Sequence, residues 1–261
     1  MENRKPTLWH IQISHYSEKA RWALRYKSVE HERRAPVPGA HMAVAAWLTH
    51  GKHFTFPVLD LEGERIGDST AIIAALEERF PALALYPADP DERRRALELE
   101  DWFDEELGPY ARRLAFYELS RDPALMTQVV GRTAPPAMAR LGRVGGASAR
   151  LFTALRFGAA SAEGAETARG KVLAALDRLE AELGEREYLV GDRFTVADLT
   201  AAALFYPLVR PAEGPFPGER LTEPFERFRE GLAGRPGFRW VEEMFRRHRR
   251  PERIPVEAAA I

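Results

Sequence analysis

The chain has 261 residues, of which 45% are hydrophobic and 30% charged, and its formal net charge is -1. This length and composition suffice for a packed core in one large domain or two small ones. The near-neutral charge gives no argument for a nucleic-acid partner, and no apolar run approaches the ~20 residues that span a bilayer. The sequence contains no cysteine, which excludes disulfides, catalysis by a protein thiol and thiolate metal sites.

The first ten residues, MENRKPTLWH, lack the apolar core of a signal peptide. Disulfide-bonded proteins belong to oxidising compartments, and this chain has no cysteine with which to form a disulfide. We therefore expect a cytoplasmic protein that makes no contact with a membrane.

The first 81 residues alternate between strand-like and helix-like patterns, which predicts a small α/β domain over residues 1–81. Glu62-Gly63 is a hairpin turn, and Asp68 or Ser69 opens the last helix, which Pro81 follows. The expected elements, in order, are a strand at 7–11, a helix at 18–26 with Ser17 as its N-cap, an edge strand within 29–37, a short helix within 41–50, strands at 58–61 and 64–66, and a helix before Pro81.

The pattern changes after Pro81. The segment PALALYPADPDE has three prolines and predicts a linker at residues 82–90. Helical periodicity dominates from Asp91 onward, which predicts an all-helical domain over 91–261. We expect a helix interrupted at Gly108-Pro109 and a second helix through Val172, Leu176, Leu179 and Leu183. A buried helix is expected in TVADLTAAALFY, where Thr195 and Asp198 have capping-box spacing. Two further helices are expected, one through Phe225 and Leu232 and the last through Phe238 and Phe245.

The segment SHYSEKARWAL places Ser14 and Ser17 three residues apart at the start of the first expected helix. In a redox enzyme the same spacing would be C-x-x-C. Because the sulfur is missing at both positions, only a hydroxyl is available for chemistry there. A hydroxyl near the positive end of a helix can donate a hydrogen bond to an anion.

Three segments, in the correct order, resemble the soluble glutathione transferase superfamily. SHYSEKARWAL is similar to the family's segment after its first strand. FPVLDLEGERIGDSTAI is similar to the family's V-P-x-L hairpin and the D-S or E-S that follows it. LVGDRFTVADLTAAA is similar to the family's G-D-x-[FL]-[ST]-x-A-D motif. The resemblance covers nearly the whole chain. It implies an α+β two-domain protein, with an N-terminal thioredoxin-like α/β domain followed by an all-α helical bundle domain.

The resemblance also implies a glutathione site in the first domain. Glutathione would be the co-substrate, and Ser14 stands where serine-type members carry the hydroxyl that stabilises its thiolate. Ser17 is the second candidate for this catalytic role, and which serine is the thiolate donor stays open. Tyr16 does not match the tyrosine-type pattern, and the cysteine-using members are poorly supported because both sulfur positions are serine.

The other implied contacts bind the rest of the tripeptide. In the family the proline at Pro57 is cis, so that the backbone of Phe56 pairs with the cysteinyl part of glutathione. Asp68 and Ser69, at a helix N-terminus, would bind the γ-glutamyl carboxylate, although plain capping explains the same residues. Candidates for the glycine carboxylate are Lys52 and His53. We expect no metal site, since His50 and His53 have no third ligand nearby.

The function implied is attack of the bound thiolate on a small electrophile, as in detoxification, by a homodimer. Isomerase, dehalogenase and ether-cleaving members would use the same thiol site with another acceptor. A different class of function, a non-catalytic thiol-binding or scaffold module, stays open, as does a small thiol other than glutathione. The basic segment 121–160 is expected to shape the acceptor pocket or the dimer edge, with an acidic surface as the alternative partner.

Overall fold

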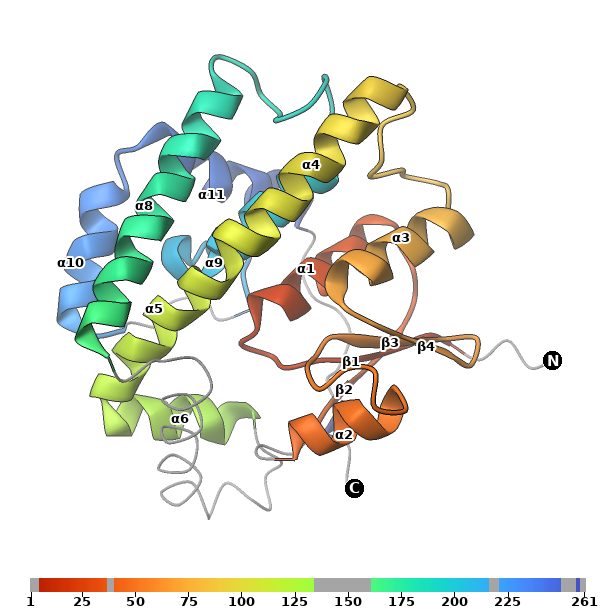
Figure 1. Ribbon diagram of the computed structural model, residues 1–261, viewed down its shortest axis with the longest axis horizontal. Helices are drawn as coiled ribbons and strands as arrows, with labels where there is room; N and C mark the ends of the chain where they lie inside the picture. The colour runs from red at the N-terminus through yellow and green to blue at the C-terminus, as the bar shows by residue number, and fades with distance from the viewer. Residues whose placement is uncertain (1–4, 37–39, 134–160, 216–220, 250–256, 259–261) are drawn as a thin grey trace. The chain divides into compact units, whose positions relative to one another are not determined.

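The computed structural model describes residues 5–36, 40–133, 161–215, 221–249 and 257–258 (Figure 1). Contacts divide the described chain into two units that part between Ala82 and Leu83. The first unit also includes α6 (Pro123–Thr133) and β5 (Glu257–Ala258), which follow the expected linker in the sequence. In the described ranges, no helix is long and apolar enough to cross a membrane.

The first unit is built on a five-stranded sheet in the order β4-β3-β1-β2-β5. β1 (Thr7–Trp9) is central and runs parallel to β2 (Glu32–Ala35) and antiparallel to β3 (Val58–Leu61). β4 (Glu64–Gly67) completes the expected hairpin, and β5 pairs with β2. The expectation of helices alone after residue 91 is therefore wrong at β5, whose two residues are too short for any sequence pattern.

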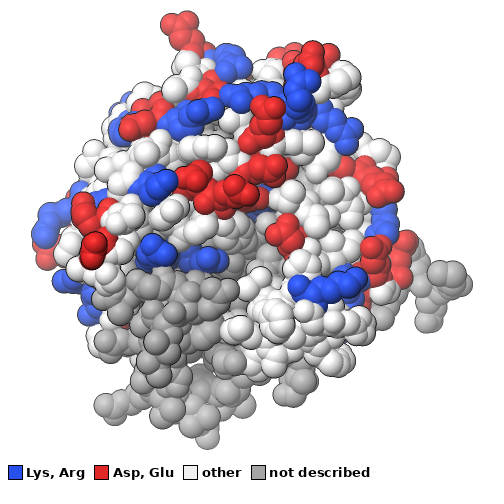
Figure 2. Space-filling view, viewed as in Figure 1, with Lys and Arg blue, Asp and Glu red and all other residues white. Residues whose placement is uncertain are grey.

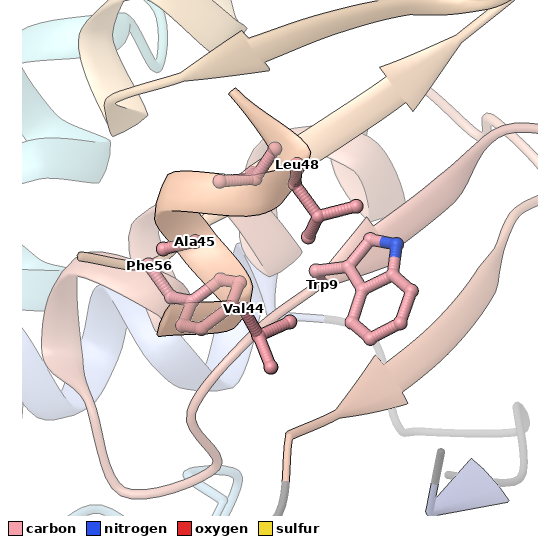
Figure 3. Close-up of a cluster of buried hydrophobic side chains, with 6 residues drawn as sticks. Trp9, Val44, Ala45, Leu48 and Phe56 are labelled. Carbon is pink, nitrogen blue, oxygen red and sulfur yellow. The ribbon is translucent and has the colours of Figure 1, made fainter. Parts of the chain in front are cut away.

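Two layers of helices cover this sheet. α1 (His15–Tyr26) and α3 (Ser69–Arg79) pack together on one face, and α2 (His41–Leu48) lies on the other (Figure 1). α2 packs against Trp9 of β1, and the side chain of Phe56 completes this apolar cluster (Figure 3). The expected α/β layer is confirmed.

In the described part of the second unit, all of the regular secondary structure is helical. α9 (Val196–Val209) is its central helix: every side chain except Pro207 is buried, as its nearly uniform apolar character predicts. It contacts α4 (Pro90–Glu106), α5 (Gly108–Arg121) and α11 (Pro236–His248). α4 ends and α5 begins around Leu107, at the expected interruption. The helices are α4 (Pro90–Glu106), α5 (Gly108–Arg121), α8 (Ala162–Leu183), α9 (Val196–Val209), α10 (Glu223–Leu232) and α11 (Pro236–His248).

The charged side chains of the surface are mixed in sign. Figure 2 shows acidic and basic side chains interspersed over the described surface of one face. Ion pairs between neighbouring helices account for part of this mixture, such as Arg95 of α4 with Glu182 of α8 at 2.7 Å. Within the basic segment expected at 121–160, the structure describes α6, and residues 134–160 lie outside the described part.

Candidate functional site

The candidate site is built on one edge of the sheet, where three neighbouring strands begin or end. Trp9, the last residue of β1, pairs with Val58, the first residue of β3. Val58 in turn pairs with Gly67, the last residue of β4. The segment that leads to Ser14, the Phe56-Pro57 pair and the segment that opens α3 therefore lie side by side at this edge.

Ser14 is the N-cap of α1, and the expectation that Ser17 has this role is wrong. The Ser14 Oγ accepts a hydrogen bond from the Ser17 backbone N at 3.2 Å, and α1 begins at His15. Ser17 is fully buried, and its Oγ accepts from the backbone N of Ile11 at 3.2 Å. The helix begins a turn earlier than expected because both serines have capping chemistry and because His15, a polar residue, is buried.

This geometry leaves Ser14 with the chemistry that a thiolate partner needs. Its Oγ uses one lone pair as the cap acceptor, and its hydroxyl proton can still be donated to a second group. Ser14 is half-buried at the N-terminus of a helix, where the aligned peptide dipoles favour an anion. Ser17 is enclosed in the protein, so Ser14 is the better placed of the two candidates.

The start of α3 is the second part of the site. Asp68 is the N-cap, and its Oδ1 accepts from the backbone N of Thr70 at 2.9 Å and of Ala71 at 3.2 Å. Its backbone has φ 75° and ψ 136°, which side-chain-bearing residues avoid at a cost of about 1–3 kcal/mol. Ser69 is the first residue of the helix and is 2% exposed. Such strain persists where the surrounding structure requires it, and it marks this turn as a functional candidate.

Phe56-Pro57 forms the third part, and the expected cis peptide bond is confirmed. The side chain of Phe56 is buried in the cluster against α2 (Figure 3). The strand ladder begins one residue after Pro57, with Val58. The backbone of Phe56 therefore lies just beyond the paired part of β3, where an extended ligand can add to the sheet edge.

His53 and Lys52, the candidates for the glycine carboxylate, differ in their surroundings. His53 lies against Gly67: a Cβ at position 67 would be 2.5 Å from its Cδ2, so only glycine permits the contact. The hydroxyl of Thr49 accepts from the His53 backbone N at 2.9 Å, and its single proton faces the carbonyls of Ala45 at 2.8 Å and His53 at 3.0 Å; the contact with the His53 amide holds this residue in place. Lys52 is exposed. The geometry thus brings His53 to the candidate site and gives no such support for Lys52.

A buried lysine, Lys19, connects two parts of the candidate site. The Nζ of Lys19, on α1, donates to the Oγ1 of Thr70 at the start of α3, at 2.8 Å, and Lys19 is fully buried. Lysine is normally read as a solvated residue, so no sequence pattern indicates this contact. Within the described residues, no group of three or more His, Asp or Glu side chains could hold a metal ion.

Comparison with known families agrees with this geometry. Residues 8–90 match the model of the glutathione S-transferase N-terminal domain, and residues 136–236 match that of the glutathione S-transferase C-terminal domain. The two matches have the order and position expected for one protein of this superfamily. The chain therefore belongs to the glutathione S-transferase superfamily.

Individual relatives are more distant. A probable maleylacetoacetate isomerase from Caenorhabditis elegans is 32% identical over 96 residues, which cover 37% of this chain and 45% of that relative. The structure of the beta-etherase LigF from Sphingobium sp. strain SYK-6 superimposes with a TM-score of 0.59, at 21% identity over 92% of this chain and 99% of that one.

A glutathione S-transferase from Methylobacterium radiotolerans, solved in complex with glutathione sulfonate, has a TM-score of 0.55. It is 24% identical over 98% of this chain and 100% of that one. At these identities, the two solved structures support the fold alone.

Proposed function

We propose that this protein is a glutathione-dependent enzyme that binds glutathione along the sheet edge and activates its thiol through Ser14. The observation that carries the proposal is the register that brings Trp9, Val58 and Gly67 into one row. This row aligns a hydroxyl donor at a helix N-terminus, an unpaired strand end and a second helix N-terminus. Glutathione is an extended anion with a central thiol. The hydroxyl donor suits its thiol, the strand end suits its backbone, and the second helix N-terminus suits a carboxylate.

Each part of glutathione has a proposed partner. The cysteinyl backbone pairs with Phe56, which leaves its side chain in the core and its peptide groups at the edge. The γ-glutamyl carboxylate is bound by Ser69 at the start of α3. The Asp68 carboxylate already accepts from two amides there, so it suits the γ-glutamyl ammonium instead. His53 is the proposed partner of the glycine carboxylate.

The proposed reaction is nucleophilic attack by the bound thiolate on an electrophilic carbon. The protein orients the thiol and lowers its pKa, because the Ser14 hydroxyl donates to the charged form and α1 adds its positive end. The protein itself forms no covalent bond in this scheme. The electrophile stays open, and an isomerase or an ether-cleaving enzyme is compatible with the same thiol site, as is a dehalogenase.

The relative named a probable maleylacetoacetate isomerase is a specific reason to test isomerisation first. The match to this relative is local, so it supports isomerisation as a second candidate function without deciding the reaction. We also propose, on the family resemblance, a cytoplasmic homodimer. A non-catalytic thiol-binding module is the alternative from another class of function.

Calorimetric titration with glutathione, followed by the ultraviolet absorbance of the bound thiolate against pH, tests the proposal. We expect saturable binding and a thiol pKa below that of free glutathione. Activity is then measured with a cis-alkene diketone acid, an aryl halide and a β-aryl ether. Absence of binding would contradict the proposal. Binding with an unshifted thiol pKa and no turnover would support the non-catalytic module.

A further inference from the structure

A buried arginine contacts the loop that carries Ser14. Arg21, on the second turn of α1, is 1% exposed, and its Nε donates to the Glu18 carboxylate at 2.8 Å. Its Nη1 lies 2.7 Å from Nδ1 of His10 and 3.4 Å from the carbonyl oxygen of Ile11, and its Nη2 donates to the carbonyl oxygen of Gln12 at 3.1 Å. One side chain therefore holds two successive carbonyls of the connection between β1 and α1.

His10 serves this arrangement as a neutral acceptor. Burial lowers the pKa of His10 well below its usual range, and the nearby cations Arg21 and Arg33 and the imidazole of His31 lower it further. Because arginine is always a donor, Nδ1 of His10 accepts and its proton resides on Nε2. Glu18, fully buried beside the guanidinium, compensates the charge of Arg21.

The Ile11 carbonyl is directly connected to the position of Ser14. The Ile11 carbonyl also accepts from the Ser14 backbone N at 3.1 Å, and the Ile11 backbone N donates to Ser17 Oγ at 3.2 Å. The Ser14 hydroxyl accepts from the Ser17 backbone N. These bonds form a closed network in which Arg21 supplies the contacts from the body of α1.

We propose that Arg21 is a positioning residue for Ser14: it fixes the carbonyls of Ile11 and Gln12 and thereby holds the Ser14 hydroxyl where the thiol is bound. The effect of this positioning on the bound thiol rests on the function proposed above. The planar guanidinium donates in three directions from one rigid fork, which a lysine ammonium does not reproduce. Arg21→Lys therefore keeps the charge and removes the geometry.

Lys27→Met is the matched control for this substitution. Lys27 lies at the other end of α1 and forms a buried ion pair with Glu77 at 2.6 Å. The control disturbs a buried cation on the same helix, far along it from Ser14. Both variants are expected to lose stability, so changes at Ser14 that occur only in Arg21→Lys are specific to the network.

Amide hydrogen exchange tests the positioning without any ligand. In Arg21→Lys we expect the amides of Ile11 and Ser17 to exchange about tenfold faster or more, relative to the amides of β3, because their local opening becomes easier. In Lys27→Met this ratio should stay as in the parent protein. Unchanged ratios in Arg21→Lys would overturn the proposal. If Arg21→Lys does not fold, His10→Leu, which removes the nearer of the two acceptors of Nη1, should give the same change in smaller degree.

The pH titration of bound glutathione tests the consequence for the thiol. In Arg21→Lys we expect the thiol pKa to rise by about one, with kcat/KM near neutral pH about tenfold lower and glutathione affinity nearly unchanged. An unchanged thiol pKa together with faster exchange would overturn the assignment of Arg21 to the thiol site. If the parent protein does not bind glutathione, the proposed function fails, and the exchange ratios alone decide the role of Arg21.

Discussion

The starts of α9 and α1 show two uses of capping chemistry. At α9, Thr195 is the N-cap and Asp198, at the third helical position, completes a capping box. The Asp198 carboxylate is fully buried and accepts from the backbone N of Leu189 at 2.7 Å and from both the backbone N and the hydroxyl of Thr195 at 2.8 Å. At α1, the half-buried Ser14 accepts from one amide. A cap that is saturated by its own chain can only stabilise the fold, whereas a cap that keeps a donor can also act on a ligand.

Breaking the saturated cap should have the largest effect. Asp198→Asn replaces a carboxylate with an amide that has one acceptor oxygen, so that buried donors lose their partners. We expect a loss of about 2–4 kcal/mol in the free energy of unfolding near neutral pH. Urea denaturation measures it, with exposed Asp91→Asn on α4 as the control. A loss no larger than that of the control would show that Asp198 contributes little to stability.

The same carboxyl should make stability depend on pH. Burial raises the pKa of Asp198 from 3.8 to about 6, although the hydrogen bonds of Leu189 and Thr195 oppose the rise. Between these values the folded state binds more protons than the unfolded state, so the contribution of Asp198 is full below pH 3.8 and is lost as pH rises to about 6. It amounts to at most about 3 kcal/mol.

The measurement is the difference in unfolding free energy between the parent protein and Asp198→Asn across this pH range, in which the contributions of other groups cancel. The difference should decrease as pH rises. A constant difference would mean that the hydrogen bonds to Asp198 offset its burial.

Breaking the open cap should change the chemistry more than the fold. In Ser14→Ala, loss of a charge-assisted hydrogen bond worth about 1.5–3 kcal/mol should raise the pKa of bound glutathione by about 1–2. Loss of the cap should cost about 0.5–2 kcal/mol of stability as well. The thiolate absorbance, titrated against pH, is the readout. If the thiol pKa did not move, the backbone amides at the start of α1 would be the stabilising groups instead.

Ser69→Ala tests whether the start of α3 binds a ligand or only begins a helix. We expect glutathione affinity to fall about tenfold, with turnover at saturating glutathione nearly unchanged, since the carboxylate is remote from the sulfur. Calorimetry measures the affinity, with exposed Thr167→Ala on α8 as the control. Unaltered affinity would leave Ser69 as a structural residue.

The smallest effect is expected for Ser17→Ala. The Ser17 hydroxyl accepts from the Ile11 amide, so its removal should cost about 0.5–1.5 kcal/mol of stability and shift the thiol pKa less than Ser14→Ala does. Thermal unfolding and the same titration provide the comparison. A larger thiol shift in Ser17→Ala than in Ser14→Ala would reverse the roles of the two serines.

Sequence periodicity predicts most of this fold because the apolar stripes are regular. The hairpin around Glu62-Gly63, the break near Gly108 and the buried α9 follow from local patterns that tertiary contacts do not override. The sequence does not distinguish the cap of α1, because Ser14 and Ser17 have the same chemistry and only their burial in the fold separates them. Buried charges such as Lys19 and Arg21 could not be predicted, since their partners lie in the three-dimensional fold and both residue types are normally exposed.

The contact of His53 with Gly67 couples two positions that are distant in the sequence. A Cβ at position 67 would also lie 2.6 Å from Cγ of His53, so the ring must move if any side chain is introduced there. Random mutagenesis at position 67 alone would therefore return mainly damaged proteins. Libraries that vary positions 53 and 67 together are the sounder starting point for redesigning this end of the candidate site, because a smaller residue at 53 makes room for a larger one at 67.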